Sequence, residues 1–312
     1  MEIQDFFLVK MIAVKIGANK KQYLDLTLGD KTGDVTGKKW DVADEELPTL
    51  NLIREGDVVK IKGIVTEWNG MRQLRVGRIR KSTKEDLLDF SDFIRSAPEK
   101  GEAMFDFVLE KARAMEDADL RTLCERLLAD NREKLLYYPA AHKNHHAERG
   151  GLLYHIKRML LAGEKMCQVY THLNADWVVA GVILHDMEKV NELVANELGI
   201  ASGYSFEGQL LGHLIQGILT INRLAEELDV PKEKVVMLEH MILSHHYEPE
   251  FGSPKRPLFP EAEMLHHLDI LDARLYDMHE ALEATSPGEF SDRVWTLDNR
   301  KLYKPQEQPE VI

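Results

Sequence analysis

The segment Trp177–Lys189 reads WVVAGVILHDMEK and decides the fold class of the part of the chain around it. Its first eight residues carry no charge and run directly into His185 and Asp186, with Lys189 shortly after. An uncharged run of this kind is typical of a protein core, where an imidazole and a carboxylate are costly unless something pairs with them. A metal ion is one such partner, and a hydrogen bond between the histidine and a nearby carboxylate is the alternative. The segment therefore predicts a buried helix that ends in candidate metal ligands.

The other histidines favour the metal. Ten of the chain's 13 histidines lie between His142 and His246, on segments whose apolar residues recur with a helical period. Each alone is more often a hydrogen-bonded core residue, but helical bundles build metal sites from side chains that converge from several helices. The helical period places an imidazole or carboxylate on an inward face of each of four further helices. The resulting candidate ligands are His155, His185, Asp186, His213 and His245, with His266, Asp269 and Asp272 together on one side of the last helix.

Composition limits the class of protein. The chain has 312 residues, 44% of them hydrophobic, which is enough for two domains with sizeable cores. Two cysteines are too few for a disulfide framework, and no stretch resembles a signal peptide or a membrane span, so we expect a cytoplasmic protein with no membrane partner. The net charge is −13, although residues 1–83 hold 15 basic against 12 acidic residues. Contact with a polyanion should therefore be local and begin near the N-terminus.

Residues 1–83 read as about five short strands separated by turns, which predicts a small Greek-key barrel. The pattern resembles an OB-fold of the nucleic-acid-binding kind. Such a barrel holds single strands by stacking bases on aromatic rings while basic side chains follow the phosphates. Core packing is the alternative for each tryptophan, and OB barrels also bind proteins. The candidate nucleic-acid contacts are Tyr23, Trp40, Trp68, Arg72 and Arg75.

The ligand order of the HD superfamily of metal-dependent phosphohydrolases resembles a series in this chain: His155, His185-Asp186, His213, His245 and Asp269. The segment LHDMEK at 184–189 is similar to the central signature of that superfamily. Longer matching segments are NHHAERGGLLYH (144–155), EGQLLGH (207–213), LSHHYEPEFGSPK (243–255), LDILDAR (268–274) and WTLDNRKLYKP (295–305). Together with an N-terminal OB-fold, these segments resemble the YhaM-type 3′-5′ exoribonucleases over nearly the whole chain. The fold class implied is multidomain α+β, with a small N-terminal OB-fold β-barrel followed by an all-α HD-domain helical bundle.

The resemblance implies two divalent ions per chain. Mixed imidazole and carboxylate ligands suit Mn²⁺, Fe²⁺, Co²⁺ or Zn²⁺, and the resemblance favours Mn²⁺. One ion would take His155, His185 and Asp269, the other His213 and His245, and Asp186 would bridge both. The predicted catalytic residues are Asp186 and Lys189, whose ammonium is placed to neutralise charge on a phosphate oxygen. The alternative for Lys189 is an ordinary lysine near a helix end.

A second set of polar residues near these motifs is predicted to contact substrate: His145, His146, His246, Ser253, Lys255 and Arg256. Two positions depart from the family pattern. Glu188 stands where a small glycine is usual, and Glu148 where tyrosine is frequent. Neither position is a ligand in the pattern, so we expect them to tune the site.

The function expected is metal-dependent 3′-5′ hydrolysis of single-stranded RNA, with single-stranded DNA as a second substrate, by a metal-activated water. The alternatives are a phosphodiesterase acting on a small nucleotide and a non-catalytic adaptor for nucleic acid or protein. We expect an OB-fold domain at 1–83, a connector at 84–100, an HD-type domain at 101–285 and a tail at 286–312. The tail would dock on the helical core or on a neighbouring subunit of a homo-oligomer.

Overall fold

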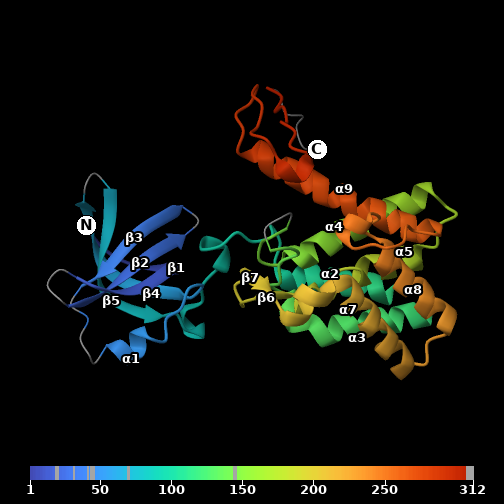
Figure 1. The fold of residues 1–312 in the computed structure, drawn as a ribbon, viewed down its shortest axis with the longest axis horizontal. Coiled ribbons are helices and arrows are strands. Elements are labelled where there is room, and N and C mark those ends of the chain that lie inside the picture. The colour runs from blue at the N-terminus through green and yellow to red at the C-terminus, as the bar shows by residue number, and fades with distance from the viewer. Residues whose placement is uncertain are drawn as a thin grey trace. The chain divides into compact units, whose positions relative to one another are not determined.

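The computed structural model describes residues 1–17, 21–30, 32–40, 42, 46–68, 71–142 and 146–306. The chain divides into two compact units, Met1–Ser96 and Ala97–Ile312 (Figure 1). A barrel of strands forms the first and helices form most of the second, which confirms the predicted α+β fold class. The division falls inside the connector expected at 84–100. The other domain boundaries stay predictions.

Five described strands of the first unit close into a barrel. They are β1 (Glu2–Ile16), β2 (Gln22–Asp30), β3 (Gly33–Lys39), β4 (Val58–Trp68) and β5 (Met71–Lys81), with the short helix α1 (Leu47–Leu50) between β3 and β4. Their order around the barrel is β1-β2-β3-β5-β4, with β3 and β5 parallel and the other neighbours antiparallel. The long β1 closes the barrel because it pairs with β4 along its first half and with β2 along its second. The predicted OB-fold barrel is confirmed.

The barrel core follows from the alternation of residues along its strands. Leu24, Leu26 and Leu28 of β2 are buried, and the residues between them are more exposed. Successive side chains of a strand point to opposite faces, so the leucines fill the interior while Tyr23 lies on the outer face. The sequence pattern thus sets which side chains of the barrel are available to a ligand.

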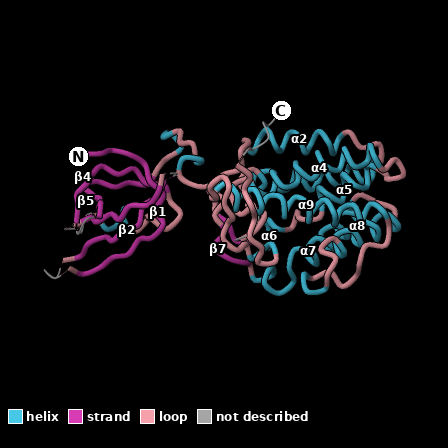
Figure 2. Tube along the Cα trace, turned by 90° about the horizontal axis from the view of Figure 1, so that it is seen from above, coloured by secondary structure: helices cyan, strands magenta, loops and turns pink. Residues whose placement is uncertain are grey.

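Helices α2 to α9 form a bundle in the second unit (Figure 2). They are α2 (Gly101–Arg113), α3 (Ala118–Leu135), α4 (Gly151–Val169), α5 (Ala175–Leu184), α6 (Lys189–Glu192), α7 (Phe206–Glu227), α8 (Lys232–Ser244) and α9 (Pro260–Glu283). A two-stranded hairpin of β6 (Leu193–Ala195) and β7 (Ala201–Tyr204) joins α6 to α7. Among the described residues, no helix is both long and apolar enough to cross a membrane.

The apolar helix α5 is the centre of this bundle. It contacts α2, α3, α4, α8 and α9, and Val182 and Ile183 are fully buried. Its first turn is capped by Asn174, whose side-chain oxygen accepts a hydrogen bond from the backbone N–H of Asp176 at 3.0 Å. Gly181 lets α8 approach closely, because a Cβ there would clash with Met241. The helix ends at Leu184, so His185 and Asp186 come directly after a fully packed element.

The C-terminal segment folds back on itself after α9. Isolated bridges pair Phe290 with Tyr303 and Val294 with Arg300, and the 3-10 turn η4 (Trp295–Leu297) lies between them. Leu297 is fully buried, and η4 contacts α9. Other 3-10 turns are η1 (Lys84–Asp86), η2 (Phe90–Asp92) and η3 (Pro249–Phe251). The described part of the tail, up to residue 306, is therefore attached to the helical unit.

Candidate active site

Five elements of the helical unit bring the predicted ligands together. His155 lies on α4, His185 and Asp186 follow α5, His213 lies on α7, His245 follows α8, and Asp269 lies on α9. All of them except the partly buried Asp269 are buried. The Oδ1 atom of Asp269 is 3.3 Å from Nε2 of His155. Residues up to 114 positions apart in the sequence thus share one small volume.

Asp186 lies between two pairs of imidazoles. Its Oδ2 atom is 3.3 Å from Nε2 of His185 and 3.8 Å from Nε2 of His155. Its Oδ1 atom is 3.3 Å from Nε2 of His213 and 3.9 Å from Nε2 of His245. One carboxylate oxygen therefore faces each pair, which is the arrangement that a carboxylate shared by two cations requires.

Two of the imidazoles are fixed by backbone carbonyls. The Nδ1 atom of His185 donates to the carbonyl oxygen of Val182 at 2.9 Å, and that of His245 donates to Ile242 at 2.8 Å. Both histidines follow the last residue of a helix, and each bonds to a carbonyl three residues earlier. Since Nδ1 carries the proton, the Nε2 lone pair is directed at the cluster.

The other two imidazoles are fixed by carboxylates. The Nδ1 atom of His213 lies 3.0 and 3.1 Å from the two carboxylate oxygens of Glu192, and Nδ1 of His155 lies 2.8 Å from Oδ2 of Asp272. A carboxylate on the outer nitrogen orients a ligand histidine and makes it a stronger donor. Each imidazole pair thus holds one carbonyl-bonded ring and one carboxylate-bonded ring.

Several inward-facing atoms of the cluster have no hydrogen-bond partner within the described part of the chain. They are Nε2 of His185, His213 and His245 and Oδ1 of Asp186, and all are buried. A buried polar atom without a partner typically costs about 1–3 kcal/mol, so four together call for a group that binds them all. Imidazole nitrogens and carboxylate oxygens without thiolate suit borderline or hard divalent cations. The residues therefore fit a divalent metal.

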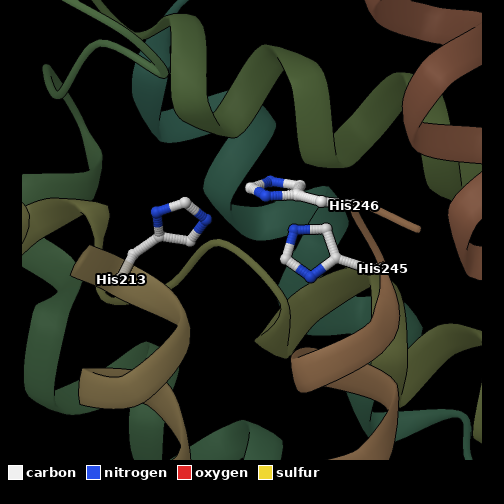
Figure 3. Close-up of side chains that lie close together, drawn as sticks. All are labelled: His213, His245 and His246. Atoms are coloured by element: carbon white, nitrogen blue, oxygen red, sulfur yellow. The ribbon is translucent and has the colours of Figure 1, made fainter. Parts of the chain in front are cut away.

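His246 extends the cluster on the His213 side. One ligand atom each from His213, His245 and His246 lie within 4.8 Å of one another, and Figure 3 shows the three rings grouped together. Three further groups of this kind are formed by His155, His185 and Asp186, by His185, His245 and Asp269, and by His146, His155 and Asp272. His246 was predicted to contact substrate, and its position also makes it a candidate ligand.

Lys189 supplies the cation nearest to Asp186. Its Nζ atom is 2.6 Å from Oδ2 of Asp186, and both side chains are largely buried. Burial by itself raises the pKa of Asp186, but the neighbouring His185 and Lys189 outweigh it, and the pKa lies well below its usual range. Burial lowers the pKa of Lys189, but Asp186 outweighs this and the pKa is raised. The two residues therefore form a charged pair at neutral pH.

Glu192 contacts the candidate ligand His213, and the sequence did not reveal this contact. It ends α6, and besides the His213 ring its Oε1 accepts the backbone N–H of His213 at 3.1 Å. Two glycines of α7 allow this: a Cβ at Gly208 would clash with the backbone of Glu192, and Gly212 has a φ of 66°, which interrupts the helix just before His213. The sequence carries no local signal for this contact, because α5 ends at Leu184 and α6 begins at Lys189, so no helical period links Glu192 to His185.

Asp272 joins several side chains behind His155. Its Oδ1 accepts from Nε of Arg158 at 2.6 Å, and its Oδ2 is 2.8 Å from Nε2 of His146. His146 is fully buried and packs on the ring of Tyr276 with centroids 3.8 Å apart. His146, for which a substrate contact was predicted, thus supports the candidate ligand His155 through Asp272. Its contact with substrate stays a prediction.

The remaining predicted substrate residues are dispersed. Ser253 is fully buried, and its hydroxyl accepts the backbone N–H of His246 at 3.1 Å. Lys255 and Arg256 are exposed, and Arg256 lies 4.8 Å from the ring centroid of Tyr247. His145 lies outside the described residues. A substrate role for these residues stays a prediction.

The two departures from the family pattern are both buried. Glu188 accepts a hydrogen bond from the amide of Asn191 at 2.7 Å. Glu148 lies with Oε1 3.9 Å from Nδ1 of His146. Both carboxylates thus contact residues around the site, and their effect on it stays a prediction.

A pocket of about 820 Å³ opens beside the cluster. Its lining includes Lys189, Glu192, His213, His245, His246 and Asp269. Three aromatic side chains, Tyr204, Phe251 and Trp295, line the same pocket. The volume lies within the range of roughly 300–1,000 Å³ that is usual for small-molecule sites. Three of the candidate ligands, His213, His245 and Asp269, are therefore accessible to a substrate from this pocket.

The outer face of the barrel carries part of the predicted nucleic-acid surface. Tyr23 and Trp40 stack with ring centroids 4.5 Å apart, and Nζ of Lys38 is 5.7 Å and 5.5 Å from the two centroids. Arg75 of β5 pairs with Lys38 of β3, so both lie next to this aromatic pair. Arg72 is exposed near the start of β5. Trp68 ends β4, but its side chain lies outside the described residues.

Metal binding is expected to release protons from the cluster. Burial lowers the pKa of His155, but Asp269 and Asp272 outweigh it and raise that pKa to about 9. The metal-free imidazole is therefore protonated at neutral pH, whereas a ligand nitrogen must be free of its proton. We expect Mn²⁺ binding near neutral pH to release about one proton per chain, and affinity to fall as the pH is lowered. Calorimetric titrations in buffers of different ionisation enthalpy measure this, and identical heats in both would contradict it.

Comparisons with known proteins follow the two units. Residues 9–81 match the OB-fold nucleic acid binding domain, and residues 152–274 match the HD domain. Two solved structures match about a quarter of the chain with TM-scores of 0.22. One is a replication protein A heterotrimer bound to ssDNA (17% identity, 28% of this chain, 61% of that chain). The other is the second OB-fold domain of replication protein A from Methanococcus maripaludis (18% identity, 27% of this chain, 86% of that chain).

One curated relative is similar over nearly the whole chain. It is the 3′-5′ exoribonuclease YhaM of Geobacillus sp. (strain WCH70), 39% identical over 304 residues that span 97% of this chain and 92% of the relative. The family resemblance seen in the motifs is therefore confirmed. Both domain types, in their expected order, and this overall identity show that the chain belongs to the YhaM family of 3′-5′ exoribonucleases.

Proposed function

We propose that the protein is a metal-dependent 3′-5′ exoribonuclease that hydrolyses the phosphodiester bonds of single-stranded RNA. The observation that carries the proposal is the set of buried Nε2 atoms around Asp186, which face one another beside an accessible pocket. The family relationship supplies the substrate and the polarity. Single-stranded DNA is a second substrate under the same chemistry.

Two groups of residues would hold two divalent ions, for which Mn²⁺ is the favoured candidate. His155, His185 and Asp269 would hold one, His213 and His245 the other, and Asp186 would contribute one oxygen to each. Bound divalent ions supply a reactive water at neutral pH and stabilise the charge on the reacting phosphate. His246 is placed to join the second group.

Lys189 acts on the phosphate from the side of Asp186. It lines the pocket, and its raised pKa keeps the ammonium charged in a buried setting where its field is weakly screened. The contact with Asp186 holds Nζ in place before substrate arrives. A fixed cation at this point neutralises charge that develops on a nonbridging oxygen.

The barrel would hold the strand while the helical unit cuts it. Tyr23 and Trp40 with Lys38 offer stacking and cationic contacts on one face, which suits a single strand of any sequence. We expect Trp40→Ala to raise KM for long RNA about 5- to 100-fold, as loss of one stacking contact does, and to leave hydrolysis of dinucleotides unchanged. Equal KM values for long RNA in the variant and the wild type would remove this face from the RNA path.

The expected cytoplasmic location and homo-oligomer stay predictions. Cys124 and Cys167 are free thiols, which suits a reducing compartment. An apolar groove of about 410 Å³ along α9, with the half-exposed Leu271 and Leu275, is the surface that a second copy would cover.

The function is tested by incubating the Mn²⁺-supplemented protein with RNA labelled at either end. A 5′-labelled strand should shorten to a ladder, and a 3′-labelled strand should release labelled mononucleotide at once. His185→Ala, with its fold verified by circular dichroism, should do neither. Turnover of small nucleotides without any of RNA would instead favour a nucleotidase, and inactivity on every phosphodiester would favour an adaptor.

A further inference from the structure

The active-site pocket has an aromatic side that the metal ligands do not explain. Tyr204, Phe251 and Trp295 line it, and they are 49%, 69% and 67% exposed. Large aromatic side chains dominate the energetics of cores and interfaces. Three exposed rings around one pocket therefore indicate a surface that binds a ligand. The pocket is thus lined both by candidate metal ligands and by exposed aromatic rings.

Trp295 lies on a turn that is anchored to the helical unit. It begins η4, where the neighbouring Leu297 is fully buried and its carbonyl accepts Nε of Arg300 at 2.9 Å. Asp298, next in the chain, pairs with Arg274 of α9 at 2.9 Å. The exposed indole therefore stands on a fixed turn, which is the preorganisation that a stacking platform needs.

The position of η4 relative to the ligands follows from α9. Asp269, Ala273 and Asp277 lie on successive turns of this helix and all line the pocket. Thr296, the residue after Trp295, lines the pocket together with Asp277, and η4 contacts α9. From Asp269 to Asp277 the helix rises about 12 Å, more than one stacked base step of about 3.4 Å. Trp295 is thus near the end of the pocket furthest along α9 from the ligand Asp269.

The charged residues near Trp295 favour recognition of an RNA base at this end of the pocket. The ionisable residues that line this end are Arg274, Asp277 and Asp298, and Asp298 pairs with both Arg274 and Arg300. These arginines are already engaged by a carboxylate, so the nucleobase is the group for which this end offers a contact. Stacking on an aromatic ring supplies affinity for every base.

We propose that Trp295 is a base-stacking residue of the active site. It holds the base of a nucleotide near the 3′ end of the RNA while the scissile phosphodiester lies at the metal ligands. The inference rests on the proposed function and assigns to the C-terminal segment a part of the substrate site. The tail thereby contributes to substrate affinity in addition to its attachment to the helical core.

The test compares Trp295→Ala, Trp295→Phe and Phe206→Ala on short single-stranded RNA. Phe206 is a matched control because it is an exposed aromatic residue of the same unit that is not among the pocket-lining residues. We expect Trp295→Ala to raise KM about 5- to 100-fold with little change in kcat, and the phenylalanine variant to retain most of the affinity. Phe206→Ala should behave as wild type.

Substrates with one abasic nucleotide, moved stepwise from the 3′ end, locate the stacked base. Wild type should lose affinity at one position in particular, and Trp295→Ala should be insensitive there. Equal KM values for Trp295→Ala and Phe206→Ala would overturn the proposal, as would a changed oligomeric mass with KM unaltered. If the wild type degrades no RNA, the proposed function fails. Equilibrium binding of the same oligonucleotides then still decides whether Trp295 stacks on a base.

Discussion

Asp186→Asn is expected to reduce RNA hydrolysis by at least about 10²–10³-fold, the loss typical when a catalytic electrostatic contact is removed. The reason is geometric, because Asp186 faces both imidazole pairs and its two oxygens lie 3.3 Å from Nε2 of His185 and of His213. An amide offers one acceptor oxygen and no charge, so one proposed ion loses a ligand and the other exchanges a carboxylate oxygen for a neutral one. Initial rates over a range of Mn²⁺ concentrations measure the effect. Recovery of wild-type rates at high Mn²⁺ would show that Asp186 is not shared.

The same substitution has a separate effect on stability. Lys189 loses the carboxylate 2.6 Å from its ammonium, and an uncompensated buried charge typically costs about 3–5 kcal/mol. The double variant Asp186→Asn, Lys189→Met should therefore regain much of the free energy of unfolding lost in the single variant, while staying inactive. Denaturant titrations of the metal-free proteins distinguish the two effects. A double variant less stable than the single one would contradict the charged pair.

Glu192→Gln is expected to weaken Mn²⁺ binding about 10–100-fold, the usual result of altering a residue that orients a ligand histidine. Glutamine still accepts a hydrogen bond from Nδ1 of His213 but removes the negative charge that makes the imidazole a strong donor. Binding should weaken at the ion of the His213 group and remain at the other, so that calorimetry resolves two classes of site. The cluster would then lose one ion before the other during dialysis.

Glu188→Gln is the matched control for this prediction. Glu188 lies four residues earlier, is more deeply buried than Glu192, and hydrogen-bonds to Asn191. Within the described part of the chain it has no hydrogen bond to a candidate ligand histidine. It should leave the affinity for both ions near that of the wild type. Equal weakening by the two variants would show that Glu192 acts through general charge in the region and does not position His213. Asp272→Asn is less selective because Asp272 also binds Arg158 and His146.

The ligands could be predicted because each leaves a local signal. His155 and Asp269 lie on the inward faces of helices, and His185 and Asp186 follow an uncharged run. Glu192 leaves none, since its role depends on the interruption of α7 at Gly212, a tertiary detail of the backbone. The hairpin β6–β7 was missed for a related reason. Strands of three and four residues are too short to show a period.

The barrel also has a feature that its sequence could not predict. The strands and the inward leucines were predictable from alternation, and Tyr23 and Trp40 were both identified as aromatic candidates. That the two rings stack on each other depends on the register of β2 and β3, in which Leu24 lies opposite Lys39. Register is set by pairing across the sheet and is not written in either strand alone. His146 lies in a segment without a periodic sequence pattern, and its backbone has a φ of 54°. The sequence therefore gave no pattern from which the burial of His146 could be predicted.

The anchoring of four imidazoles through Nδ1 bears on which ion the enzyme uses in the cell. Two carbonyls and two carboxylates hold the rings before any cation arrives, so loading demands little reordering of the polypeptide. Nitrogen and oxygen donors of this kind accept several first-row ions, with affinities that follow the Irving–Williams order. The identity of the working metal would then depend on intracellular supply more than on discrimination by the protein.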